Sequence, residues 1–223
     1  MYENEVEIGN AIKNAGLDRK EIFLTTKLNN TDHGYEAALK AFDDSLKKLG
    51  QDYVDLYLIH WPIKEGRAAS WKGLEKLYAE KRVKAIGVAN YNITLLEELK
   101  LTANIVPAVN QIEFSPWLYQ EDLLAYCKAA GIQVQSYSPI TRGLKFSDER
   151  LVLICNKYNR TPAQIVLNWH LQHGISTIPK SSKKERLVEN FDATSFTLSN
   201  EDVKIMNGFN ENFRICDDPQ TYL

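Results

Sequence analysis

The chain has 223 residues, enough for one domain with a well-buried core. Hydrophobic residues make up 44% and charged residues 25% of the sequence, which is ordinary for a globular protein. A formal net charge of -2 gives no electrostatic case for nucleic acid or an anionic membrane surface as a partner, and no apolar run is long enough to span a bilayer.

Six short runs rich in Val, Ile, Leu and Tyr predict β-strands. Their apolar residues are nearly consecutive, which is typical of strands covered on both faces in a parallel sheet. In chain order they are residues 22–26, 54–59, 84–88, 107–112, 132–137 and 175–178.

Helical patterns separate these strands. Apolar residues spaced by three or four predict helices over 38–49, 71–78 and 151–158. Thr161 followed by Pro162 signals the start of a helix that runs to His173. Ser199 to Asp202 resembles a capping box and opens a final helix.

The strict alternation of strand and helix indicates a single α/β domain over 1–223. Periodicity alone does not separate a closed barrel from an open doubly wound sheet. An open dinucleotide-binding sheet should carry a Gly-x-Gly-x-x-Gly turn after its first strand, and its absence favours the barrel.

The three cysteines, Cys127, Cys155 and Cys216, are odd in number, widely spaced and without a Cys-x-x-Cys pair. This pattern argues against a disulfide framework and against a metal site. Cys127 and Cys155 fall on apolar helical positions, where we expect buried thiols. A reducing, cytoplasmic environment fits best, and the acidic start of the chain is no secretory signal.

Three apolar runs end in polar residues able to do chemistry: Lys27, His60 and Asn90. In a barrel of parallel strands the chemistry lies at the C-terminal strand ends, so the three runs predict an active-site rim. Read in isolation, Lys27 is better interpreted as a solvated strand-end lysine and His60 as a core histidine. His33, His170 and His173 match no such pattern and are interpreted as structural.

These residues belong to motifs that occur in a set order: Tyr2-Glu3-Asn4-Glu5, then Thr25-Thr26-Lys27-Leu28, then Leu58-Ile59-His60-Trp61-Pro62. The set resembles the aldo-keto reductase family over nearly the whole chain. The resemblance implies a TIM-type (β/α)8 barrel and the reduction of small aldehydes or ketones. It also implies that Tyr2 is the catalytic acid, that Lys27 and His60 assist it, and that Trp61 lines the substrate pocket.

The implied roles are chemically consistent. Carbonyl reduction needs a hydride at carbon and a proton at oxygen. A tyrosine with an ordinary pKa of about 10 is a poor acid at neutral pH. A neighbouring ammonium favours the phenolate, and a histidine can hydrogen-bond the substrate oxygen.

The resemblance also implies NADPH as cofactor. Asn90 and Gln111 match positions that bind the nicotinamide carboxamide, and Tyr137 matches the aromatic residue that stacks on the ring. The family usually has serine where this chain has Ala89. Further positions match the pyrophosphate segment (Ser138, Ile140 and Arg142) and the site for the 2′-phosphate and adenine (Lys180, Ser181, Arg186, Glu189 and Asn190).

The family carries an aspartate in an Asp-Thr-Ala-x-x-Tyr segment, and this segment would begin before Met1. The resemblance therefore implies a barrel truncated at its N-terminus to about six strands, with the helix at 3–14 retained. We expect the chain as written to have open sheet edges, to be aggregation-prone or oligomeric, and to show little activity. A form completed upstream is expected to be an active monomer.

Two other functions stay open at this point. One is a catalytically impaired NADP(H)-binding regulatory or interaction protein on the same fold. The other, an unrelated barrel hydrolase, needs paired carboxylates at strand ends, and only Glu113 is well placed. The sequence does not identify the physiological aldehyde or ketone.

Overall fold

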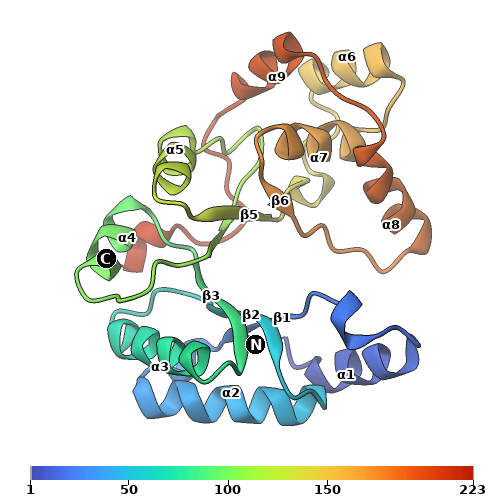
Figure 1. The fold of residues 1–223 in the computed structure, drawn as a ribbon. Helices are drawn as coiled ribbons and strands as arrows, with labels where there is room; N and C mark the ends of the chain where they lie inside the picture. Colours follow the sequence, from blue (N-terminus) through green and yellow to red (C-terminus); the bar gives the residue numbers. More distant parts are fainter. Residues whose placement is uncertain (1, 223) are drawn as a thin grey trace. The chain divides into compact units, whose positions relative to one another are not determined.

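The computed structural model describes residues 2–222, which fall into two compact units (Figure 1). Unit 1 contains the chain up to Asn110, Ala130–Ile132 and the segment from Pro219. Unit 2 contains Gln111–Ala129 and Gln133–Asp218. A single domain over 1–223 stays a prediction.

Unit 1 is a parallel β/α layer. Its strands β1, β2 and β3 follow one another in chain order, with Lys27 opposite Leu58 and Leu58 opposite Gly87. Strand β4 (Val109–Glu113) starts beside β3, where the Ala108 amide donates to the Ile86 carbonyl at 2.9 Å. The other elements are α1 (Glu5–Asn14), β1 (Thr25–Leu28), α2 (Tyr35–Leu49), β2 (Val54–Ile59), α3 (Arg67–Ala79), β3 (Val83–Ala89) and α4 (Ile93–Lys100).

Helix α2 packs on the sheet through the apolar stripe that its sequence predicts. Ala38, Phe42, Leu46 and Leu49 are all buried, and the Phe42 ring meets the Tyr57 ring of β2 edge-on at 4.9 Å. Helix α1 lies against the end of α2 at a glycine. A Cβ on Gly9 would come within 2.3 Å of the Leu49 carbonyl oxygen, so only glycine permits this approach.

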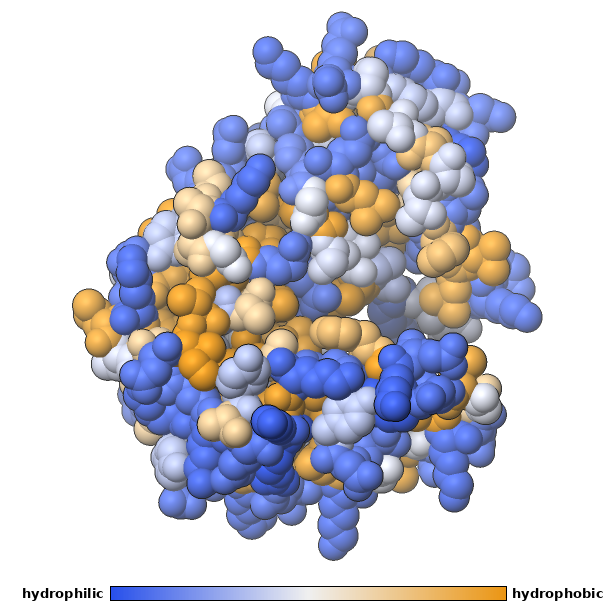
Figure 2. All heavy atoms as spheres, in the orientation of Figure 1, coloured by the Kyte–Doolittle hydropathy of each residue, from blue (hydrophilic) through white to orange (hydrophobic). Residues whose placement is uncertain are grey.

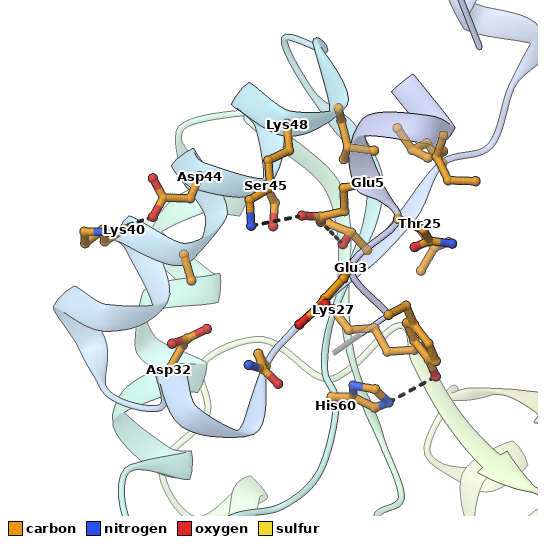
Figure 3. Close-up of a pocket in the computed structure, with 18 of the residues that line it drawn as sticks. Glu3, Glu5, Thr25, Lys27, Asp32, Lys40, Asp44, Ser45, Lys48 and His60 are labelled. Atoms are coloured by element: carbon orange, nitrogen blue, oxygen red, sulfur yellow. Dashed lines mark hydrogen bonds and ion pairs between the residues drawn. The ribbon is translucent and has the colours of Figure 1, made fainter. Parts of the chain in front are cut away.

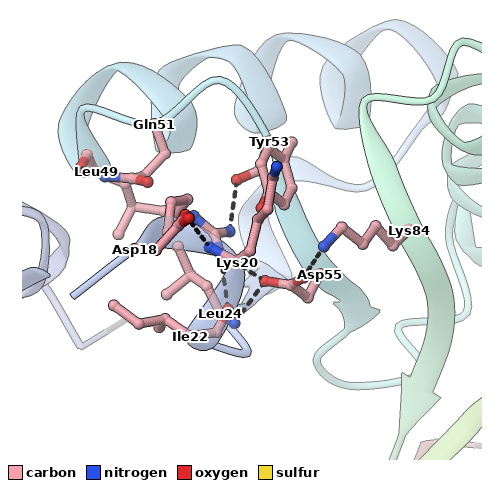
Figure 4. A network of polar contacts seen from close by, with 10 residues as sticks. Asp18, Lys20, Ile22, Leu24, Leu49, Gln51, Tyr53, Asp55 and Lys84 are labelled. Carbon is pink, nitrogen blue, oxygen red and sulfur yellow. Dashed lines mark hydrogen bonds and ion pairs between the residues drawn. The ribbon is translucent and has the colours of Figure 1, made fainter.

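A buried carboxylate fixes the start of β1 (Figure 4). Asp55 of β2 accepts from the Leu24 amide at 2.9 Å, from Arg19 Nη1 at 2.9 Å and from Lys84 Nζ at 2.8 Å. Burial would raise the pKa of Asp55, but these contacts outweigh burial and hold it below its ordinary value. Asp55 is therefore charged and anchors the segment that leads into β1.

Unit 2 continues the alternation with its own strands in chain order, β4, β5 and β6. Gln135 of β5 lies opposite Ser176 of β6. Its elements are α5 (Glu121–Ala129), β5 (Gln133–Tyr137), α6 (Glu149–Tyr158), α7 (Pro162–Gln172), β6 (Ser176–Thr177), α8 (Lys184–Phe191) and α9 (Asn200–Asn207).

Helix starts in unit 2 match the sequence signals to different degrees. Thr161 caps α7 and forms a full capping box with Gln164, as its position before Pro162 predicts. At α9 the Ser199 hydroxyl accepts from the Asp202 amide at 3.1 Å, but the Ser199 amide donates to the Tyr158 hydroxyl at 2.8 Å and not to the Asp202 carboxylate, so the box is incomplete. The α9 capping-box prediction is thus only half right.

The predicted strand at 22–26 is shifted in the structure. Strand β1 begins at Thr25 because a short 3-10 helix, Arg19–Glu21, precedes it and Arg19 Nη1 binds the Ile22 carbonyl at 2.8 Å. Strand β2 has the predicted bounds, 54–59. Cys127 and Cys155 are buried as expected.

The surface of α8 carries apolar side chains that are largely exposed (Figure 2). Phe191 is 78% exposed, Val188 64% and Leu187 48%. Exposed apolar side chains gathered on one helix favour association with another surface. Across residues 2–222, no helix combines the length and the apolar character needed to cross a membrane.

Candidate active site

The structure brings the three predicted catalytic residues together in unit 1 (Figure 3). The Tyr2 hydroxyl oxygen is 3.4 Å from His60 Nε2, and the two ring centroids are 5.6 Å apart. Lys27 Nζ lies 4.9 Å from the centroid of the Tyr2 ring. A phenol, an ammonium and an imidazole therefore occupy one small volume.

Local structure explains this meeting. Strands β1 and β2 pair in parallel, so Lys27 near the end of β1 and His60 after β2 emerge at the same edge of the sheet. Tyr2 precedes α1, whose Glu5 accepts a hydrogen bond from the Thr26 hydroxyl of β1 at 2.8 Å. That bond, together with the Gly9 contact, holds the start of α1 beside β1.

Asn90 supports His60 from the end of β3. Its Nδ2 donates to the His60 carbonyl at 2.9 Å, and the residue is 2% exposed. Asn90 has φ 64°, a left-handed conformation that Asn tolerates better than most residues. This backbone turn lets the side chain reach back to the neighbouring strand end.

Burial sets the charge states of the cluster. It lowers the pKa of Lys27 to about 8, and no carboxylate of the described residues forms an ion pair with this ammonium. Burial first, and then the charge of Lys27, lower the pKa of His60 to about 4. At neutral pH the imidazole is therefore neutral and the lysine mostly charged, while Tyr2 is 66% exposed and accessible to a ligand.

A pocket of about 330 Å³ opens beside the cluster. Tyr2, Lys27 and His60 line it together with residues of α1, β1 and α2, which include Glu5, Lys40 and Lys48 (Figure 3). Trp61 does not line this pocket: its ring stacks on that of Tyr222, with centroids 5.2 Å apart. The assignment of Trp61 to a substrate pocket stays a prediction.

Unit 2 carries most of the predicted cofactor residues. Gln111 Nε2 donates to Gln135 Oε1 at 2.6 Å, which fixes the orientation of its amide. Tyr137 ends β5 and is half-buried. Burial raises the pKa of the Tyr137 hydroxyl, and the nearby Cys216 and Glu113 raise it further. The hydroxyl donates a hydrogen bond to the Cys216 thiol.

The segment after β5 has an unusual backbone. Ser138, Thr141 and Arg142 have φ of 50°, 49° and 53°, in the left-handed region that L-residues rarely adopt. Thr141 is β-branched and 1% exposed, and its hydroxyl has no hydrogen-bond partner within residues 2–222. Such strain clusters at ligand-binding segments, so Thr141 joins Ser138, Ile140 and Arg142 as a candidate that the sequence did not signal.

The predicted phosphate site has free positive charge. Lys180 and Arg186 are exposed and make no hydrogen bond or ion pair to any described residue. Helix α8 starts after Lys183 without a side-chain cap, which leaves its first N–H groups available. The Ser181 hydroxyl accepts from the Lys183 amide at 3.1 Å and so fixes the turn that leads into α8. Glu189 and Asn190 are half-buried on α8. These groups fit a phosphate monoester.

Comparisons with known proteins show the family of the chain. A sequence model of the Aldo/keto reductase family matches residues 1–211. The glyoxal reductase of Bacillus subtilis is 46% identical over 223 residues, which are 100% of this chain and 81% of that protein. The chain belongs to the aldo/keto reductase family.

Further relatives of this aldo-keto reductase support the assignment. Methylglyoxal reductase DkgA of Escherichia coli K12 is 40% identical over 225 residues, covering 99% of this chain and 81% of the relative. The crystal structure of MGS-M4, an aldo-keto reductase from a deep-sea metagenome library, has a TM-score of 0.94 at 44% identity, over 97% of this chain and 81% of that one. A mutant of Gox0644 in complex with NADPH has a TM-score of 0.93 at 39% identity, covering 99% and 81%. The fold is therefore of the TIM-barrel type of this family.

Proposed function

We propose that Tyr2, Lys27 and His60 are the catalytic residues of this aldo-keto reductase. As a member of the family, the protein is an oxidoreductase that uses NADPH to reduce the carbonyl group of small aldehydes or ketones. The observation that supports the residue assignment is the meeting of a phenol, an ammonium and a neutral imidazole within 3.4–4.9 Å at a pocket wall.

Each residue has a distinct task in the proposal. The cofactor supplies the hydride that adds to the carbonyl carbon. The Tyr2 hydroxyl donates its proton to the carbonyl oxygen. The Lys27 ammonium favours the phenolate that is left behind, because a nearby positive charge stabilises a negative one. Neutral His60 hydrogen-bonds the carbonyl oxygen without adding a second positive charge to the site.

We propose that the unit 2 residues bind NADPH for the same reaction. Lys180, Ser181 and Arg186 take the 2′-phosphate, and Glu189 and Asn190 the adenine. Ser138, Ile140 and Arg142 bind the pyrophosphate. Tyr137 stacks on the nicotinamide and Gln111 binds its carboxamide. Asn90 is also proposed to bind the carboxamide, and Trp61 to contact the substrate. The phosphate assignment is favoured because Lys180 and Arg186 form no ion pair with any described residue and because α8 starts without a side-chain cap.

Within the aldehydes and ketones, the substrates can be proposed more closely. Two relatives are named for glyoxal and methylglyoxal, and the pocket beside Tyr2 has polar groups, Lys27 and His60 among them, that can bind carbonyl oxygens. We therefore propose short aldehydes and dicarbonyls as substrates. The net charge of -2 and the lack of disulfide-like cysteine spacing favour a cytoplasmic protein without a nucleic-acid partner.

The test is a paired measurement of NADPH binding and turnover. NADPH oxidation is followed by absorbance with methylglyoxal and a panel of longer aldehydes, and binding is measured by calorimetry. In the form completed upstream, for which activity is expected, we expect NADPH binding and turnover, fastest with short substrates. NADPH binding without turnover of any aldehyde would instead favour the non-enzymatic NADP(H)-binding protein.

A further inference from the structure

The C-terminal part of unit 2 is held by one buried carboxylate. Glu113, the last residue of β4, is 3% exposed. Its Oε1 accepts from the Ile215 amide at 2.7 Å, and its Oε2 accepts from the Cys216 amide at 3.0 Å. Both oxygens thus bind consecutive backbone amides, and no lysine or arginine of the described residues forms an ion pair with Glu113.

The same segment is anchored just upstream by the loop that follows β4. The Trp117 carbonyl accepts from the Glu211 amide at 3.1 Å and from the Phe213 amide at 3.0 Å. Gln120, from the same loop, donates to the Glu113 carbonyl at 2.8 Å. Strand β4 and its loop therefore dictate the path of residues 211–216 through four backbone amides.

This path carries Cys216 to Tyr137. The Tyr137 hydroxyl donates to the Cys216 thiol, and Glu113 is close enough to act on both groups electrostatically. A tyrosine at a strand end has two side-chain torsions, and a hydrogen bond at its hydroxyl restricts both. The position of the Tyr137 ring therefore depends on where Glu113 holds the backbone of Cys216.

We propose that Glu113 is a positioning residue: by holding the amides of Ile215 and Cys216, it orients the Tyr137 ring for stacking on the nicotinamide. The inference rests on the proposed function, which places Tyr137 against that ring. A carboxylate is needed because both of its oxygens accept. A glutamine of the same size would turn an NH2 group toward one of the two amides, and two donors would then face each other.

Two ligands separate positioning from a general structural role. NADPH contains the nicotinamide. Adenosine 2′,5′-bisphosphate has the same 2′-phosphate and adenine but no nicotinamide. In Glu113→Gln we expect the NADPH dissociation constant to rise about tenfold, the scale of one lost charge-assisted hydrogen bond. Adenosine 2′,5′-bisphosphate should bind within about twofold of the native value, since its contacts lie elsewhere in the proposal.

Two further variants complete the experiment. Glu149→Gln makes the same change at an exposed position of α6 and should leave both ligands unaffected. Cys216→Ala keeps the Glu113 contacts but removes the acceptor of the Tyr137 hydroxyl, so it should also weaken NADPH selectively; it carries the test if Glu113→Gln does not fold. Equal weakening of both ligands, or an unchanged NADPH affinity, overturns the inference. Failure of the native protein to bind either ligand overturns the proposed function as well.

Discussion

The lowered pKa of Lys27 predicts the pH range in which the reductase works. With a pKa of about 8, roughly nine-tenths of the Lys27 side chains are charged at pH 7, about half at pH 8 and about a tenth at pH 9. If the ammonium is needed to favour the phenolate of Tyr2, kcat/KM should fall about tenfold per pH unit above pH 8. An ordinary lysine would keep its charge to about pH 10.

The perturbation that tests this is Lys27→Arg, which retains the charge at every pH used. kcat/KM for methylglyoxal is measured from NADPH absorbance between about pH 6 and 10, within the range where arginine stays protonated. We expect the variant to be slower but to lose the fall near pH 8. Lys13→Arg, at an exposed position of α1, should keep the native profile. The same fall near pH 8 in Lys27→Arg would refute the reasoning, because another group would then be titrating.

Three further outcomes follow from the structure. Arg186→Ala should weaken NADPH about 10- to 100-fold in calorimetry and leave NADH nearly unchanged, because only NADPH carries the 2′-phosphate; equal weakening would count against this role. His60 and His170 are buried, with pKa lowered by burial to about 4, so the unfolded chain takes up protons first. The contribution of each histidine to the free energy of unfolding should therefore be fully present above about pH 6.5 and fall toward pH 4, by up to about 3 kcal/mol. Urea melts at several pH values would detect this fall. Gly9→Ala should push α1 off α2 and reduce turnover and melting temperature together, whereas Asn10→Ala, exposed on the same helix, should change neither.

The sequence predicted that Lys27 and His60 would meet at one sheet edge, because both stand in short motifs at strand ends. Parallel strands bring such ends together whatever the details of packing. Residues 54–59 are apolar apart from Asp55 and are buried throughout, as is typical of a strand covered on both faces. The start of β1 was displaced because it depends on Asp55 and Arg19, which act through tertiary contacts.

Other features had no local signal. Helices α4 and α5 are short and bury only three and two residues, so the spacing of their apolar residues gave no clear helical pattern. The strained conformation of Thr141 contradicts the preference of a β-branched residue. The contacts of Glu113 with the amides of residues 215 and 216 span about a hundred positions along the chain. Such contacts arise from topology, which a single sequence does not display.

The central claim, hydride transfer to a carbonyl with Tyr2 as the acid, is tested most directly by isotope transfer. NADPH that carries deuterium at both C4 positions of the nicotinamide is incubated with methylglyoxal, and the alcohol product is analysed by mass spectrometry. The account predicts one deuterium on the former carbonyl carbon with the native protein. It also predicts that Tyr2→Phe binds NADPH normally but forms at least about a hundredfold less of this product. Product without deuterium, or an undiminished rate in Tyr2→Phe, would contradict the account.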